Sequence, residues 1–224
     1  MKAGGLEIHW LGHAGFFIRN SLKIYIDPYN ISEEAAKEKA DLILITHSHY
    51  DHCSVEDLNK IVQEKTRIIC TADCQSKIAR FDVPVKIDIV EPGQEVDLGM
   101  IKISAVPAYN VDKDFHPRTS NWVGYLIKFG GEGGTLIYHA GDTDKIDEMQ
   151  RLTGFQAENF IAMLPIGGRF TMDAEEAAEA AALIKPTLAV PMHYGSIVGS
   201  EEDAREFVDM CKEKGVNAEI LDKE

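Results

Sequence analysis

We predict an α/β fold with two β-sheets and helices on their outer faces, and three observations lead to it. Short apolar runs rich in β-branched and aromatic residues recur along the chain, as is typical of strands. Helical segments with capping residues lie between some of these runs. With 224 residues, 45% of them hydrophobic and 27% charged, the chain can bury a large core. We therefore expect a single domain over residues 1–224.

The strands are expected where apolar runs are bounded by Gly, Pro or Asn-Ser. DLILITH is apolar for most of its length, as in a strand that is buried on both faces. GGEGG at residues 130–134 is expected to be a hairpin turn between two strands. In chain order the predicted strands are LEIHWLG, AGFFIRN, LKIYIDP, DLILITH, TRIICT, VKIDIVE, MIKISAVPAY, NWVGYLIKFG, GTLIYHAG, ENFIAMLPIGG, TLAVPMHYG and NAEIL.

The helices are expected where apolar residues recur at helical spacing between capping signals. The predicted helices are SEEAAKEKA, SVEDLNKIVQEK, DAEEAAEAAALIKP and EEDAREFVDMCKEKG. Ser32 would cap the first of them. Asp173 and Glu176 have capping-box spacing in the third, which Pro186 would stop, and Gly215 would end the fourth.

Charge and cysteine content narrow the class of protein. The net charge of −14 argues against nucleic acid as the main partner. No apolar run approaches the roughly 20 residues of a membrane span, and the N-terminus lacks the apolar core of a signal peptide. Cys53, Cys70, Cys74 and Cys211 are too scattered for a disulfide framework, so we expect reduced thiols. We predict a cytoplasmic protein that acts on a small molecule; the sequence leaves a homo-oligomer open.

The segment ITHSHYDHC, residues 45–53, carries the strongest chemical signal. It contains three of the eight histidines, His47, His49 and His52, together with Asp51. Imidazole nitrogen and carboxylate oxygen are the usual ligands of transition-metal ions in proteins. Because a buried strand precedes these residues, a turn at the edge of a sheet can bring them together. We therefore predict a site for one or two metal ions.

Several motifs resemble the metallo-β-lactamase superfamily of metal-dependent hydrolases. THSHYDH matches the His-x-His-x-Asp-His signature of that superfamily, and the likeness covers nearly the whole chain. WLGHAGFFI resembles its opening hairpin, IYIDP its next strand, YHAGDT its bridging-aspartate motif, and VPMHYG its last metal motif. Order and spacing are similar to the compact branch that includes ascorbate-6-phosphate lactonase. This resemblance implies a four-layer αββα sandwich with the site at one edge of both sheets.

The resemblance also implies a set of metal ligands. It assigns one ion to the first two signature histidines and a histidine from a middle loop, and a second ion to the remaining signature residues and a C-terminal histidine. An aspartate would bridge the two ions. The implied sets are His47, His49 and His116 for one ion, Asp51, His52 and His193 for the other, and Asp142 as the bridge.

One position departs from the superfamily pattern. The family usually carries a further histidine just after a middle strand, but here that strand ends in Tyr109-Asn110. The next histidine is His116, which we expect to fold back from its loop and complete the first site. The alternative is that His116 lies on the surface and that water or Asn110 takes its place.

Other residues are expected to support the site. Asp51 is a catalytic candidate, because the resemblance places it nearest the point of attack, where it would orient the water. Asp27 would accept ring N–H bonds from signature histidines or cap a turn, and His13 would support a ligand or simply stabilise its loop. His139 is expected to be structural or supporting, and Cys53 a buried structural thiol. Arg118, Arg169 and Tyr194 are weaker candidates for substrate binding.

The predicted function is metal-dependent hydrolysis. A metal-bound hydroxide would cleave an ester, lactone, phosphoester or phosphodiester of a small molecule. We expect Zn²⁺, with two ions bound, while Mn²⁺ and Fe²⁺ stay open. The sequence carries no Gly-x-Ser-x-Gly elbow, P-loop or dinucleotide-binding fingerprint. Two alternatives remain: an iron-dependent redox protein or thiol dioxygenase on the same scaffold, and a non-catalytic metal-binding protein.

Overall fold

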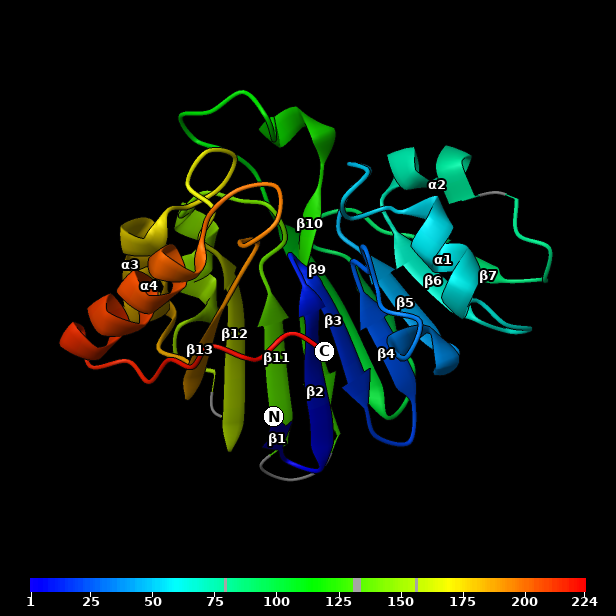
Figure 1. Cartoon of the computed structure of the whole chain (residues 1–224), viewed down its shortest axis with the longest axis horizontal. Helices are drawn as coiled ribbons and strands as arrows, with labels where there is room; N and C mark the ends of the chain where they lie inside the picture. The colour runs from blue at the N-terminus through cyan, green and yellow to red at the C-terminus, as the bar shows by residue number, and fades with distance from the viewer. Residues whose placement is uncertain (79, 131–133, 156) are drawn as a thin grey trace. The chain divides into compact units, whose positions relative to one another are not determined.

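The chain forms two compact units, each built on one mixed β-sheet (Figure 1). The computed structural model describes residues 1–224 except 79, 131–133 and 156. The first unit consists of residues 1–91 and 221–224, and the second of residues 92–220. The sequence resemblance extends over nearly the whole chain. We therefore keep the prediction of a single domain over residues 1–224 as a prediction, although the contacts divide the chain into two units.

The sheet of the first unit has seven strands in the order of the sequence. The first four are joined by antiparallel pairing and the last four by parallel pairing, so the carboxyl ends of β4, β5 and β6 lie at one edge. The strands are β1 (Lys2–Ala3), β2 (Leu6–Gly12), β3 (Gly15–Arg19), β4 (Lys23–Ile26), β5 (Leu42–Ile45), β6 (Arg67–Cys70) and β7 (Lys86–Ile89).

Helices α1 (Val55–Ile61) and α2 (Ala72–Ile78) and the 3-10 turn η1 (Ala35–Lys37) pack in one core with this sheet (Figure 1). Leu58 of α1 and Ile78 of α2 are buried in that core with Ile43 of β5. All four residues of β5 are buried, which confirms the prediction of a strand covered on both faces. β5 also pairs with a strand on each side, β4 and β6, so the direction in which the chain leaves the sheet after Ile45 is fixed.

The sheet of the second unit has six strands, and three of them are parallel. β11, β12 and β13 run parallel to one another, whereas β8, β9 and β10 pair antiparallel. Because two antiparallel steps separate β9 from β11, both strands point the same way. The strands are β8 (Glu95–Asp97), β9 (Ile101–Pro107), β10 (Val123–Phe129), β11 (Thr135–His139), β12 (Asn159–Pro165) and β13 (Leu188–Met192).

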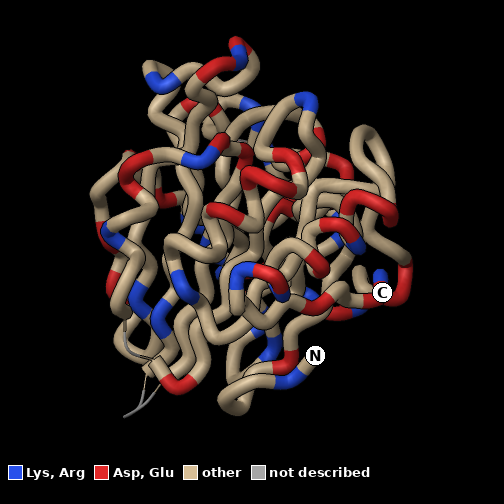
Figure 2. The backbone as a smooth tube through the Cα atoms, turned by 90° about the vertical axis from the view of Figure 1, so that its left-hand side faces the viewer, with Lys and Arg blue, Asp and Glu red and all other residues tan. Residues whose placement is uncertain are grey.

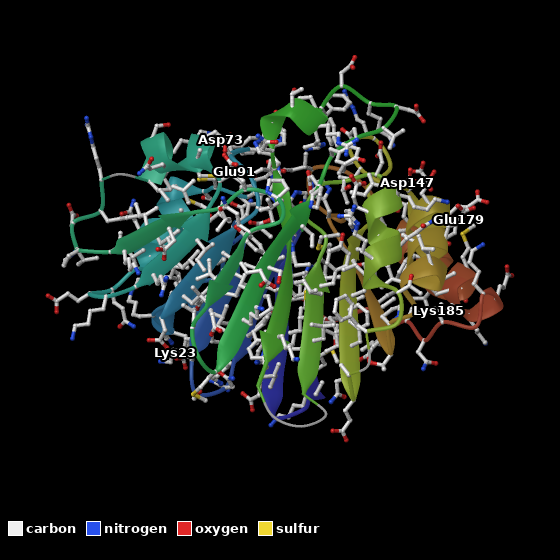
Figure 3. All side chains as sticks on the ribbon, turned by 180° about the vertical axis from the view of Figure 1, so that it is seen from behind. Lys23, Asp73, Glu91, Asp147, Glu179 and Lys185 are labelled. Carbon is white, nitrogen blue, oxygen red and sulfur yellow. The ribbon has the colours of Figure 1, made fainter. Side chains whose placement is uncertain are left out.

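Helices α3 (Ala174–Ile184) and α4 (Glu201–Glu213) lie side by side against β12 and β13 (Figure 1). The predicted capping box is confirmed: Asp173 accepts from the backbone N–H of Glu176, and Glu176 accepts from that of Asp173. Lys185, labelled in Figure 3, ends α3 in the left-handed conformation, one residue before Pro186. The 3-10 turn η3 (Asp147–Leu152) packs against α3, and η2 (Arg118–Ser120) follows the loop of His116.

Several local predictions were wrong. SEEAAKEKA forms only the turn η1, although Ser32 Oγ does accept from Ala35 N at 3.1 Å. The helix predicted over SVEDLNKIVQEK is present as α1 but ends at Ile61, earlier than predicted, and NAEIL contributes only an isolated bridge between Ala189 and Ala218. Helix α2, strand β8 and η3 were missed because each is short, and short elements carry too few periods to be recognised. The predicted turn GGEGG includes residues 131–133, which lie outside the described residues.

Charged residues are mixed in sign along the backbone. Figure 2 shows Lys and Arg scattered among the more numerous Asp and Glu of the chain, 23 against 37. In the second unit Glu179 of α3 pairs with Lys145, and Asp147 begins the neighbouring η3 (Figure 3). Within the described part of the chain, no helix has the length and apolar character needed to span a bilayer.

The four cysteines should be unreactive in the folded protein. Cys53, Cys70, Cys74 and Cys211 are all free and buried, and burial raises the pKa of the Cys211 thiol to about 12. Hydrogen bonds from Cys53 and Cys70 lower the pKa of the Cys74 thiol to about 5, so it is burial that keeps reagents from Cys74. We expect an aromatic disulfide reagent to label none of them within minutes in native protein and all four after denaturation. Rapid labelling of native protein would contradict this packing.

Candidate metal centre

The first histidine cluster consists of His47, His49, Asp51 and His52 and lies just past the carboxyl end of β5. Thr46 follows that strand, and a tight turn closes after it: His49 O accepts from both His52 N at 3.1 Å and Cys53 N at 2.8 Å. The rings of His47 and His52 are 4.1 Å apart between centroids, and those of His47 and His49 are 4.6 Å apart. The structure thus brings these signature residues together at the edge of the sheet.

Asp27 organises this cluster from the end of the neighbouring strand β4. Its side chain is fully buried and accepts three hydrogen bonds. Thr46 N donates to Oδ1 at 2.8 Å, while Thr46 Oγ1 and His52 Nδ1 donate to Oδ2 at 2.6 and 2.8 Å. The His52 proton therefore resides on Nδ1, which leaves a lone pair on Nε2. This is the role expected of Asp27, and the rival role of turn capping is not needed.

Thr46 fixes the ring proton of His47 in the same way. The Thr46 hydroxyl has one proton, and it donates that proton to Asp27. His47 Nδ1 lies 2.9 Å from the same Oγ1, so His47 must be the donor and Thr46 the acceptor. His47 therefore also carries its proton on Nδ1 and a lone pair on Nε2. One carboxylate and one hydroxyl set two imidazoles to the tautomer that a metal ligand requires.

His13 joins this cluster from the turn between β2 and β3. Its Nε2 lies 2.9 Å from Asp51 Oδ2, and His52 Nε2 lies 3.7 Å from the same oxygen. Trp10 Nε1 donates to His13 O at 2.9 Å and holds the turn. His13 was expected only as a supporting residue or a loop histidine, and the contact with Asp51 favours the first of these.

The second histidine cluster consists of His116, Asp142 and His193, and its members come from three strand ends. Asp142 follows β11 and His193 follows β13, two strands that run parallel to β12 between them. Residue 116 lies in the loop after β9, which points in the same direction. His116 Nε2 and His193 Nε2 lie 3.2 and 3.1 Å from Asp142 Oδ2. All three side chains are nearly inaccessible to solvent.

Three residues of the two clusters and their supports have an unusual backbone conformation. His13, Asp27 and His193 have positive φ angles of 53°, 42° and 59°, a conformation that costs non-glycine residues free energy. A side-chain carbon on Gly167 would lie 2.7 Å from His193 O and 3.2 Å from its Nδ1. Glycine at that position therefore lets the chain after β12 pass closely behind His193.

The donor atoms of each cluster suit a transition-metal ion. Two ligands at about 2.0–2.1 Å from one tetrahedral ion are separated by about 3.3 Å. The separations of His116 and His193 from Asp142, 3.2 and 3.1 Å, are close to that value. In the first cluster, the ligand atoms of His13, Asp51 and His52 lie within 4.8 Å of one another. Imidazoles with fixed Nδ1 protons and a carboxylate are the donor set that Zn²⁺, Mn²⁺ or Fe²⁺ accepts.

The weaker candidates are placed differently. Arg118 is 70% exposed, pairs with Glu148 at 2.8 Å and lies over the ring of Tyr109. Arg169 is exposed and lies over the ring of Phe170. Tyr194 is buried beside His193. None of these placements tests substrate binding, which stays a prediction for all three.

Sequence reasoning missed Thr46 and Asp144. Thr46 is the residue before the signature, and its importance depends on a hydrogen bond to Asp27, 19 positions earlier. Asp144 is buried two residues after Asp142 and holds the loop of His116. His139, expected to be structural, is buried and accepts from Gly141 N at 3.3 Å. A buried polar network of this kind leaves no periodic signal in the sequence.

Comparison with known proteins settles the family. The β-lactamase superfamily domain matches residues 7–193, a stretch that contains both histidine clusters. The chain belongs to the metallo-β-lactamase superfamily. Its sequence is 32% identical to a UPF0173 metal-dependent hydrolase of Archaeoglobus fulgidus, over 96% of this chain and 95% of that protein.

Solved structures agree with this membership of the metallo-β-lactamase superfamily. A protein of Parabacteroides distasonis described as a metal-dependent hydrolase has a TM-score of 0.81 at 30% identity, over 96% of this chain and 92% of that one. A metallo hydrolase of the archaeon Ignicoccus hospitalis has a TM-score of 0.76 at 25% identity, over 97% and 95%. The predicted fold class, an αββα sandwich of the metallo-β-lactamase type, is confirmed, and the family is one of metal-dependent hydrolases.

Proposed function

We propose that the protein hydrolyses an ester, lactone, phosphoester or phosphodiester bond of a small molecule, with two Zn²⁺ ions as cofactor. The observation that carries this proposal is that the Nδ1 atoms of three histidines each lie within hydrogen-bond distance of a protein acceptor. His47, His52 and His116 each hold their proton on Nδ1 through a protein acceptor, so each Nε2 offers a lone pair. Buried histidines arranged in this way suit a cation better than a hydrogen-bonded core.

The proposed ligand sets follow the superfamily resemblance. They combine residues of both clusters, with the carboxylate of Asp142 shared between two ions. Support comes from the two imidazole nitrogens that converge on one oxygen of Asp142. The sets are His47, His49 and His116; Asp51, His52 and His193; and Asp142 as the bridge.

The chemistry divides between the ions and the protein. When bound, divalent ions supply a water-derived nucleophile at neutral pH and positive charge for the developing anion. Asp51 would orient the attacking water, and its contact with His13 holds one of its two oxygens in place. Burial of the surrounding side chains keeps bulk solvent away from these charges, which strengthens their interaction.

Exposed aromatic side chains next to the proposed ligands narrow the choice of substrates. Tyr50, beside Asp51, is 63% exposed, and Phe115, beside His116, is 45% exposed. Tyr50 contacts Tyr29, and Phe115 contacts Phe170, each edge to face. Large apolar groups kept in solvent beside a site favour substrates with an apolar or aromatic group. Arg118, Arg169 and Tyr194 remain predicted substrate-binding residues.

Metal analysis combined with a substrate screen tests the proposal. We expect purified protein to contain one to two equivalents of zinc, to lose hydrolysis after chelation, and to regain it with Zn²⁺ or Mn²⁺. The screen should cover aryl esters, aromatic lactones, phosphomonoesters and phosphodiesters. Full activity after exhaustive removal of metal would contradict the proposal. A coloured, iron-containing protein that oxidises thiols would instead establish the redox alternative.

A further inference from the structure

The loop that carries His116 is closed by a single asparagine. Asn110 N donates to His116 O at 2.8 Å, and Asn110 Oδ1 accepts from His116 N at 2.9 Å. Asn110 therefore contacts both backbone polar groups of His116 across residues 110–116. This is the position at which the superfamily pattern leads one to expect a ligand histidine.

The same side chain also contacts the His116 ring. His116 Nδ1 lies 2.9 Å from Asn110 Oδ1 and 3.1 Å from Phe170 O. A carbonyl oxygen of either kind can only accept, so His116 Nδ1 must carry the proton. His116 Nε2, 3.2 Å from Asp142 Oδ2, then holds the lone pair.

The orientation of the Asn110 amide is fixed by its other partners. Its Nδ2 donates to Asp144 Oδ1 at 3.0 Å and to Phe170 O at 2.9 Å. A flipped amide would present its oxygen to those two acceptors and its N–H groups to the donors of His116. The observed orientation is therefore the one that satisfies every partner.

Asp144 accepts hydrogen bonds from three residues of this loop. It is 4% exposed and accepts from Asn110 Nδ2, from Val111 N at 2.8 Å and from Lys113 Nζ at 2.8 Å. Lys113 balances its charge, and the chain of contacts runs from Lys113 through Asp144 and Asn110 to His116. Since Asp144 is only two residues from Asp142, the loop and the proposed bridge are held in register.

We infer that Asn110 is a positioning residue that, together with Asp144, holds His116 in the Nδ1–H tautomer with Nε2 toward Asp142. Asn110 therefore acts through His116 and is not itself a metal ligand. The inference rests on the proposed role of His116 in metal binding. It explains how a histidine six residues beyond the usual position can serve, because the asparagine at that position turns the later histidine inward.

Competition with a chromophoric chelator measures the effect on metal affinity. Asn110→Ala should weaken Zn²⁺ binding at one site by about 10- to 100-fold, as is typical when a residue that supports a ligand is removed. Asp114→Ala, an exposed change in the same loop, should alter affinity by less than about twofold. In a His116→Ala background, loss of Asn110 should cause no further weakening, because the two residues act in series.

The two single variants and the double variant together distinguish an error in the proposed ligand set from an error in this inference. If His116→Ala binds two ions as tightly as the unmodified protein, the proposed ligand set is wrong and this inference falls with it. If His116→Ala weakens binding but Asn110→Ala does not, only the inference is overturned. If Asn110→Ala weakens binding further in the His116→Ala background, Asn110 acts on the metal by itself, which also overturns it.

Nitrogen-15 NMR of the zinc-loaded protein reports the His116 tautomer directly. The His116 ring, assigned by comparison with His116→Ala, should show a protonated Nδ1 and an unprotonated Nε2 that binds the ion. A protonated Nε2 with a bare Nδ1 would overturn the inference. In zinc-loaded Asn110→Ala, the fraction of His116 rings with a protonated Nδ1 and an unprotonated Nε2 should fall.

Discussion

Replacing Asp142 with asparagine is expected to remove at least one of two bound ions and to abolish hydrolysis. An amide is neutral and offers one oxygen, whereas the Asp142 carboxylate brings a negative charge within 3.2 Å of two imidazole nitrogens. Metal affinity should fall by more than the roughly 10- to 100-fold typical of a supporting residue. Elemental analysis after gel filtration, together with activity, measures both effects.

Asp147→Asn is the matched control for this variant. It removes the same charge from an exposed position on η3 in the same unit and should leave metal content and rate within about twofold. Unchanged metal content in Asp142→Asn would remove Asp142 from the proposed centre.

Asp27→Asn should have the second-largest effect, although Asp27 is not a proposed ligand. If the amide oxygen keeps the bond from Thr46 N, the amide nitrogen is set against both Thr46 Oγ1 and His52 Nδ1, which donate to Oδ2 of Asp27. One imidazole would then lose its fixed Nδ1 proton, and metal affinity should fall by about 10- to 100-fold. Isothermal titration of metal-free protein with Zn²⁺ measures this loss.

Thermal unfolding of the metal-free protein accompanies that titration. A mismatched donor on a fully buried side chain should also destabilise the fold by about 1–3 kcal/mol. Asp82→Asn, an exposed change in the same unit, should affect neither stability nor binding. Wild-type affinity in Asp27→Asn would mean that tautomer control by Asp27 is unimportant.

Most of the fold could be predicted because long strands and helices carry strong local signals. The apolar run of β5 and the capping box at Asp173 identify their elements from a few residues. The turn η1 and the C-terminal segment NAEIL were mispredicted because tertiary contacts decide short segments. The division into two compact units likewise depends on contacts between residues far apart in the chain, and the periodicity of the sequence does not predict such contacts.

The candidate site was predictable where its chemistry is concentrated in a motif. His47, His49, Asp51 and His52 lie within six residues, so the cluster can be read directly. Asn110 was considered only as an alternative ligand and Thr46 not at all, because each acts through hydrogen bonds to residues placed by other parts of the fold. Their residue types are common in turns, and only the partners reveal what they do.

The most direct test of the proposed centre is a crystal structure of zinc-loaded protein with anomalous diffraction recorded at the zinc edge. We predict two anomalous peaks, with Asp142 bound to both and Nε2 of His47, His52, His116 and His193 each about 2.0–2.1 Å from one of them. Two peaks elsewhere on the chain, or His116 turned away with Asn110 or water in its place, would contradict it.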